Sequence, residues 1–189
     1  MSIPSAHALP DSRDSGSGLP LSQRSGSEVH IARTSIVDNA ATHGGGVFSY
    51  GGDVTISDST IAHNVARGLY DYTHISPSTN GEGGGIYIGN GALSVRNSTI
   101  TDNLAKVDYA PVPNASGGGI HAGNSASIDI ANSIVAGNLA NVDNDIHGAI
   151  AVSDGHNLLG TIVAGSILGD QQNIPAGNIF ATIDPAIGG

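Results

Sequence analysis

The chain has 189 residues, which is enough for one domain with a sizeable buried interior. Glycine accounts for 28 residues while aromatic residues make up only 4% of the chain, so the composition favours thin stacked layers filled by small aliphatic side chains over an ordinary two-layer globule. The formal net charge of −10 argues against nucleic acid and anionic lipid as partners, and the absence of cysteine excludes disulfides, thiolate metal sites and a cysteine nucleophile.

The first element in chain order is a lead-in over residues 1–27, which is rich in Ser, Gly, Pro and Asp and lacks alternating apolar residues. Such a composition predicts irregular or disordered chain. The rest of the chain, residues 28–189, is expected to form a single domain, because one repeating pattern runs through most of it.

That pattern is a repeat over residues 28–160, in which three glycines precede a short apolar run and a polar turn. The glycine runs end at Gly46, Gly85 and Gly119, and a turn asparagine follows 18, 18 and 19 residues later. Alternating residues within the unit mark short strands with one buried face. Three strands and three turns fit into about 25 residues, and such a coil must stack on a neighbour to pair its backbone groups. The repeat therefore predicts an all-β fold, a right-handed parallel β-helix (solenoid) of about five to six coils with two loop insertions.

Aligning the coils gives three columns of residues. The first turn column is Arg33, Asp58, Asn97, Asn132 and Asn157. The second turn column is Asn39, Asn64, Asn103 and Asn138, and an apolar column of Ile36, Ile61, Ile100 and Val135 lies between the two. We expect the asparagine side chains to hydrogen-bond to the coils above and below. Ile100 should be buried between Ile61 and Val135.

Two insertions of unequal length, residues 67–82 and 106–116, leave the same corner of neighbouring coils. Both place an aspartate next to a tyrosine. The candidate binding residues in them are Tyr70, Asp71, Tyr72, His74, Asp108 and Tyr109. Loops of variable length on a rigid scaffold often carry function, although a tolerated surface insertion explains the same pattern equally well.

The last element, residues 161–189, is still apolar but leaves the register of the repeat. We expect it to form a distorted last coil or a cap, because an open end of the stack is a strand edge that invites aggregation.

A further column consists of aromatic and histidine side chains on the strand after each glycine run. The apolar residue of that strand points inward, so the next residue should point outward. This column is Phe48, Tyr87, His121 and His147. Its rings suit the apolar faces of sugars, but they could also simply stack on one another and stabilise the sheet.

The segments GGGIYIGNGALSVRNSTITDNLA, NSIVAGN, DGHNLLG and IDPAIGG resemble the right-handed parallel β-helix repeats of large bacterial exported and surface proteins. Within that group the chain looks most like proteins with a choice-of-anchor type C-terminal region, and the resemblance covers residues 28–189. It implies a location outside the cell or on the cell surface, as part of a longer exported protein. Related β-helices include pectate lyases, polygalacturonases and epimerases.

Two functions from different classes are compatible with these features. The first is an extracellular or cell-surface module that binds polysaccharide along the outward column without catalysis. The alternative is a polysaccharide-active enzyme, a lyase or a glycoside hydrolase, that uses the Asp, Tyr and His residues of the loops. The chain has only six Lys and Arg residues, which favours the first, because the lyases that it resembles often use Arg or Lys as a strong base.

The expected partners are polysaccharides or cell-surface glycans, and not nucleic acid. No apolar run approaches the ~20 residues that span a bilayer, so no membrane insertion is expected. We expect no cofactor beyond weak Ca²⁺ binding by Asp and Asn residues in turns.

Overall fold

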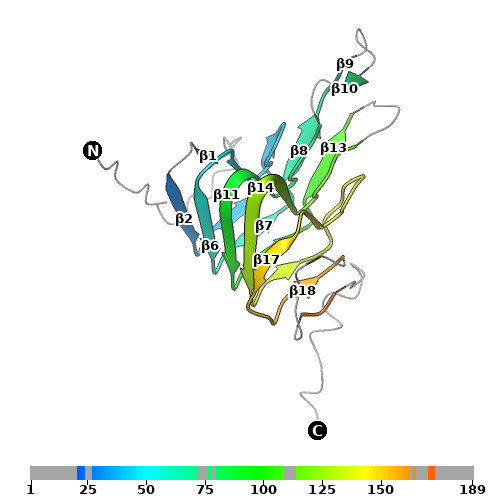
Figure 1. The fold of residues 1–189 in the computed structure, drawn as a ribbon. Helices are drawn as coiled ribbons and strands as arrows, with labels where there is room; N and C mark the ends of the chain where they lie inside the picture. The colour runs from blue at the N-terminus through cyan, green and yellow to red at the C-terminus, as the bar shows by residue number, and fades with distance from the viewer. Residues whose placement is uncertain are drawn as a thin grey trace, which may run out of the picture.

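The structure is a computed structural model of the chain, and it describes residues 21–23, 27–71, 76–77, 80–108, 114–161, 164 and 170–172. Within these ranges the backbone forms eighteen strands and no helix (Figure 1). Consequently, the described part of the chain contains no helix with the length and apolar character needed to cross a membrane.

The described strands fall into five successive rounds of the chain. The first round is β1 (Leu21–Gln23), β2 (Glu28–Ala32), β3 (Ser35–Val37) and β4 (Ala40–Ala41). The second is β5 (Val47–Ser49), β6 (Asp53–Ser57), β7 (Thr60–Ala62) and β8 (Val65–Gly68). The third is β11 (Ile86–Arg96), β12 (Thr99–Thr101) and β13 (Leu104–Val107), and the fourth is β14 (Ile120–Ala131), β15 (Ile134–Val135) and a one-residue bridge at Leu139. The fifth is β16 (Ile146–His147), β17 (Ile150–Ser153) and β18 (Leu158–Leu159).

Equivalent strands of successive rounds pair to form three sheets. The first sheet contains β1, β2, β5, β6, β11, β14, β16 and β17, the second β3, β7, β12, β15 and β18, and the third β4, β8 and β13. All of these pairings are parallel. By contrast, β9 (Tyr70–Asp71) and β10 (Ser76–Pro77) form an antiparallel pair inside the first insertion. The predicted all-β class with parallel strands is thus confirmed, and the arrangement fits a parallel β-solenoid. One short strand, β1, lies within the predicted lead-in.

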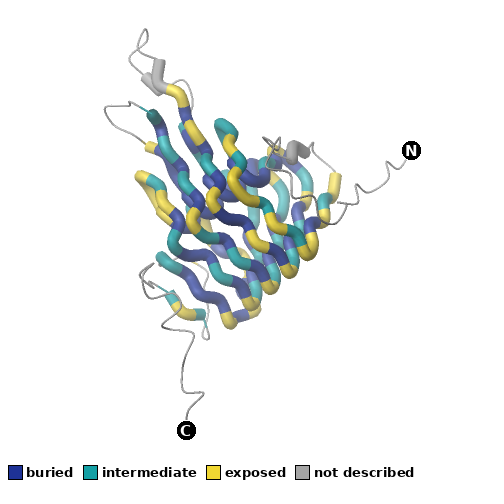
Figure 2. The backbone as a smooth tube through the Cα atoms, turned by 180° about the vertical axis from the view of Figure 1, so that it is seen from behind, coloured by how far each residue is buried: buried dark blue, intermediate teal, exposed yellow. Residues whose placement is uncertain are grey.

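The core is a set of aliphatic residues that point inward from all five rounds. Figure 2 shows their buried segments lying side by side from one round to the next. Ile100 is fully buried and pairs in register with Ile61 on one side and Val135 on the other, as predicted. Each such side chain contributes roughly 1.5–3 kcal/mol by leaving water, so the stacked column is the main source of stability.

A ladder of asparagine amides, buried in all but the first round, runs along one corner of the stack. Its members are Asn39, Asn64, Asn103 and Asn138. In each step the main-chain N–H and the side-chain Nδ2 of one asparagine both donate to Oδ1 of the asparagine in the next round, at 2.9–3.0 Å. The predicted hydrogen bonding between rounds is therefore confirmed for this column.

A second ladder runs along the corner between the first and second sheets. Its members are Thr34, Ser59, Ser98, Ser133 and Asn157. The main-chain N–H of each member donates to the side-chain oxygen of the next, at 2.9–3.2 Å.

The place of Asn157 in this second ladder corrects the predicted alignment, which put it in the first turn column after Asn132. The left-handed corner conformation of Asn132, with φ of 47°, is instead adopted by His156, with φ of 60°. The fifth round is one residue shorter at this point than the alignment assumed. An asparagine oxygen accepts a hydrogen bond as a serine oxygen does, so Asn157 continues the serine ladder.

Both ladders end on an aspartate at their C-terminal side. Asp145 Oδ1 accepts from the main-chain N–H and Nδ2 of Asn138 at 2.9 and 3.0 Å. Asp170 Oδ1 accepts from the main-chain N–H and Nδ2 of Asn157 at 3.2 and 2.9 Å. In each ladder the bonds to side-chain oxygens run toward the C-terminal side, so the last member must accept from its neighbour without passing such a bond on. A carboxylate does this, because an ionised carboxylate is an acceptor only.

Asp145 is buried, and its backbone occupies the place of the last glycine in each glycine run. The N–H of Ile120 donates to the carbonyl of Asp145, as the N–H of Ile86 donates to that of Gly119. Burial raises the pKa of the Asp145 carboxyl, while its two hydrogen bonds from Asn138 partly oppose the shift. Burial thus disfavours the negative charge of Asp145, while its oxygen serves the ladder as an acceptor.

We therefore expect the Asp145→Ala variant to lose about 2 kcal/mol of unfolding free energy at pH 7, because the buried N–H and amide of Asn138 lose their shared acceptor. Asp145→Asn keeps an acceptor oxygen and removes the buried charge, so it should be at least as stable as the parent. Urea denaturation of the three proteins measures this. If Asp145→Asn is destabilised as much as Asp145→Ala, the negative charge itself stabilises the end of the ladder.

Candidate functional site

The four residues predicted to share one outward column do stack on one another in successive rounds. Phe48 on β5, Tyr87 on β11, His121 on β14 and His147 on β16 are register partners in the first sheet. Their ring centroids are 5.2, 5.2 and 4.6 Å apart along the column, with interplanar angles of 11°, 9° and 17°. Each follows a buried aliphatic residue, so alternation along the strand turns its ring outward. We call this set the ring column.

Stacking covers the faces of the inner rings, so the column is less exposed than its outward direction suggests. Phe48, Tyr87 and His147 are half-buried, and His121 is only 8% exposed. His121 therefore has little contact with solvent, although alternation directs its ring outward as predicted. The rings of Tyr87 and His147 lie against its two faces, and its Nδ1 shares a hydrogen bond of 2.9 Å with the hydroxyl of Ser116.

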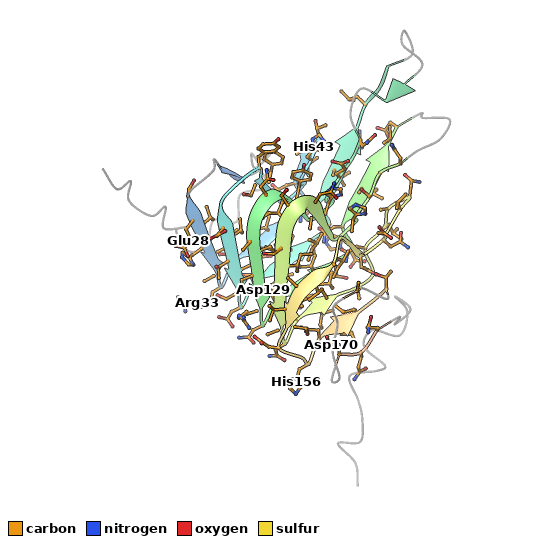
Figure 3. All side chains as sticks on the ribbon, viewed as in Figure 1. Glu28, Arg33, His43, Asp129, His156 and Asp170 are labelled. Atoms are coloured by element: carbon orange, nitrogen blue, oxygen red, sulfur yellow. The ribbon has the colours of Figure 1, made fainter. Side chains whose placement is uncertain are left out.

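Polar side chains line the corner that precedes the ring column. His43, Glu82 and Ser116 stand immediately before the three glycine runs and are bridged to one another in parallel. The His43 ring meets the edge of Tyr87 at a centroid distance of 5.5 Å, and its Nε2 lies 3.7 Å from Glu82 Oε2. In the fifth round, Asp143 Oδ2 lies 2.7 Å from Nδ1 of His147. Figure 3 shows His43 at the upper end of the molecule, where β11 and β14 begin, far from Arg33 and His156.

Sequence reasoning missed these corner residues, although a signal for them exists. The residue before each glycine run holds the same place in every round, so the glycines that reveal the repeat also mark the corner. A column alignment extended by one residue to His43, Glu82 and Ser116 would have found them.

The electrostatics of the ring column follow from burial. Burial is the main cause that lowers the pKa of His121 to about 4, and the nearby His147 and His43 add to the effect, partly opposed by Ser116 and Asp143. Burial, then the charge of Glu82, then Tyr50, raise the pKa of Tyr87. At neutral pH, therefore, His121 is uncharged and Tyr87 keeps its hydroxyl proton.

Tyr50 is an exposed ring beside the column that sequence reasoning also missed. It lies two residues after Phe48 and so shares its outward direction, and it is 64% exposed. Its ring packs over the backbone of Gly89, where an added Cβ would lie 3.1 Å from Cδ2 of Tyr50. The alternation of side-chain direction along a strand, extended two residues beyond Phe48, would have predicted it. Tyr50 is the aromatic residue near the column whose ring is most open to solvent.

The loop candidates are described only in part. Tyr72, His74 and Tyr109 lie outside the described residues, and of Tyr70 and Asp71 the structure describes the backbone of β9.

Of the two predicted loop carboxylates, Asp71 and Asp108, the structure describes the side chain of Asp108, which is held in an ion-pair cluster. Its oxygens lie 3.2 Å from Nε of Arg67 and 2.9 Å from Nζ of Lys106. The hydrogen bond from Lys106 is the main cause that lowers the pKa of Asp108, and the charges of Lys106 and Arg67 add to it. Asp108 therefore stays ionised and is unsuited to act as a general acid.

Among the described residues, no group of three or more His, Asp and Glu side chains is arranged to hold a metal ion. Weak Ca²⁺ binding in the turns stays a prediction.

Comparison of the chain with protein-family models, with curated proteins and with solved structures finds no match in any of the three. The functional argument therefore rests on the geometry of the ring column and its surroundings.

The low pKa of His121 predicts acid sensitivity. The unfolded chain takes up this proton near pH 6.5 and the folded chain only near pH 4, so the unfolding free energy falls as the pH drops through this interval. After allowance for solvent screening, the loss is about 2 kcal/mol.

His121→Phe keeps a stacked ring but cannot titrate, so the difference in unfolding free energy between pH 7 and pH 4 should shrink by that amount. His30→Gln, at a histidine with a side chain more than half exposed, is the matched control and should leave the difference unchanged. Chemical denaturation between pH 7 and pH 4 measures how the unfolding free energy of each of the three proteins changes with pH. Equal slopes for the parent and His121→Phe would show that His121 is not protected from protonation.

Proposed function

We propose that the chain is a non-catalytic module with a right-handed parallel β-helix fold that binds polysaccharide along the ring column, outside the cell or on the cell surface, as part of a longer exported protein. The observation that carries the proposal is the stack of Phe48, Tyr87, His121 and His147 with the exposed ring of Tyr50 beside it.

The handedness and the location rest on general arguments. Connections between parallel strands of one sheet are right-handed in about 98% of cases, which supports a right-handed helix. The resemblance of the repeat to exported β-helix proteins supports an extracellular location.

The stacked geometry favours a particular mode of sugar binding. Because stacking covers the ring faces, the half-buried Tyr87 and His147 would offer their edges to a ligand, with the Tyr87 hydroxyl among the polar groups. These groups, together with the carboxylates of Glu82 and Asp143, can exchange hydrogen bonds with sugar hydroxyls. Tyr50 supplies an open ring face for the apolar side of a sugar. Repetition of these groups at the spacing of the rounds suits a ligand that is itself extended.

The catalytic alternative is weaker. A glycoside hydrolase needs two carboxylic groups across the scissile bond, one of them with a raised pKa so that it can donate a proton. Asp108, which was predicted as a loop carboxylate and has a described side chain, has a lowered pKa and two cationic partners. It is therefore the wrong kind of group for the proton donor.

A glycan panel tests the proposal. The parent should bind at least one neutral polysaccharide, and Tyr50→Ala should weaken that binding by about tenfold or more, which corresponds to ~1.4 kcal/mol. Tyr87→Phe keeps the stack and removes the edge hydroxyl, so it should weaken binding by a smaller factor. Val152→Ala, at an exposed residue of β17, is the control and should bind as the parent does.

Incubation of the same preparation with each bound glycan should release neither reducing ends nor unsaturated products. Turnover of any glycan would support the enzyme instead. If no glycan of a broad panel is bound, or Tyr50→Ala binds as the parent does, the ring column is only a structural stack.

A further inference from the structure

The third sheet has the pattern of a sheet whose outer face is covered. Its inward residues include Ala66 and Ala105, which are fully buried, whereas one outward position is aliphatic in each round. The residues at this position are Ala40, Val65, Leu104 and Leu139, which are register partners in four successive rounds. We call this set the aliphatic strip.

The aliphatic strip is open to solvent in the single chain. Leu139 is 60% exposed, and Val65 and Leu104 are half-buried. Leu69, directly after the end of β8, is 58% exposed. Single exposed aliphatic residues are ordinary, but a column of them in register forms one continuous patch, which is typical of an interaction surface.

Charged residues flank the strip, with opposite sign on its two sides. On the side where the strands begin, the exposed corner residues Asp38, His63 and Asp102 each stand two positions before a member of the strip. On the other side, Arg67 and Lys106 each stand two positions after a member and are register partners. One edge of the strip is thus mainly acidic and the other basic.

We propose that the aliphatic strip is a self-association surface, on which a second copy of the chain docks face to face with its strands antiparallel. A two-fold axis along the stacking direction places each round opposite the same round of the partner copy and reverses the strand direction. The acidic edge of one copy then faces the basic edge of the other, so that Asp102 meets Lys106 twice by symmetry. A two-fold axis along the strands would instead place the acidic edges together.

The charges in this arrangement set the register of the dimer, and the aliphatic side chains supply the attraction. Asp108 already pairs with Arg67 and Lys106 within the chain, so the basic edge keeps one net positive charge. Pairs of this kind at the rim select the orientation of docking more than they add affinity. A strip four rounds tall is small for an interface, so the dimer should be weak.

The dimer would leave the ring column free. That column lies on the first sheet, and Figure 1 shows β8 and β13 of the third sheet side by side and apart from the strand pair β11 and β14. Two copies joined through the third sheet therefore keep both ring columns accessible, which would raise avidity for an extended ligand.

Sedimentation velocity of the full chain over a concentration series up to about 0.5 mM tests the proposal, because a weak interface of this size is populated in that range. The parent should pass from monomer to dimer as the concentration rises. Leu139→Glu should stay monomeric, and its circular dichroism should match the parent because Leu139 is exposed. Val152→Glu, an equivalent change on the first sheet, is the control and should dimerise as the parent does.

The basic edge is tested separately, by a change that does not touch the strip. Lys106→Glu places like charges opposite Asp102 and should weaken the dimer by about tenfold, whereas Lys106→Arg should leave it unchanged. A parent that is monomeric at the highest concentration overturns the proposal and leaves the strip to a different partner. The proposal is also overturned if Leu139→Glu forms dimers at the same concentration as the unmodified chain.

Discussion

Hydrogen bonds from the backbone of one round to the side chains of the next are the constraint on which the rest of this structure depends. At a tight corner the backbone turns away from its neighbour, and a buried N–H would be left without an acceptor at a cost of about 1–3 kcal/mol. Asn103 satisfies the buried donors on both sides of its round. Its N–H and Nδ2 donate to Asn138, and its Oδ1 accepts from Asn64. Because the bonds to side-chain oxygens in these two ladders all point toward the C-terminal side, the ladders need an acceptor at their end, which Asp145 and Asp170 supply.

The fixed corners decide what appears on the surface. Residues at equal distance from a corner lie above one another in successive rounds, so one outward position becomes a column. On the first sheet this produces the ring column, and on the third sheet it produces the aliphatic strip. The two faces differ in chemistry because one offers ring edges and hydrogen-bonding groups, while the other offers aliphatic carbon between two charged edges.

Much of the fold could be predicted from the sequence, because the features that repeat are those that the stacking requires. The glycine runs and the asparagines at constant spacing gave the parallel rounds, the buried place of Ile100 and the ring column. Asn157 was misplaced because an asparagine serves equally well at an exposed left-handed corner and in the serine ladder. Only the length of the fifth round decides whether Asn157 lies at the corner or in the serine ladder.

The site was less predictable. Alternation along a strand tells only which way a side chain points, whereas its exposure to solvent depends on the side chains of the neighbouring rounds. His121 points outward as predicted, yet Tyr87, His147 and Ser116 bury it. Glu82 and His43 hold a repeated position in the sequence, but only the fold brings His43 against Tyr87 and Glu82 against His43.

The register of the rounds is the central claim, and disulfide cross-linking tests it directly because the chain has no cysteine of its own. Thr60 and Thr99 point outward from adjacent rounds and are register partners, so their Cα atoms are about 4.8 Å apart, within the range that a disulfide spans. The Thr60→Cys/Thr99→Cys variant should form an intramolecular disulfide on mild oxidation, seen as a mass loss of two hydrogens. Thr60→Cys/Thr101→Cys displaces one partner by two residues, to a Cα separation beyond about 7 Å, and should stay reduced. A disulfide in the second variant, or none in the first, would contradict the register.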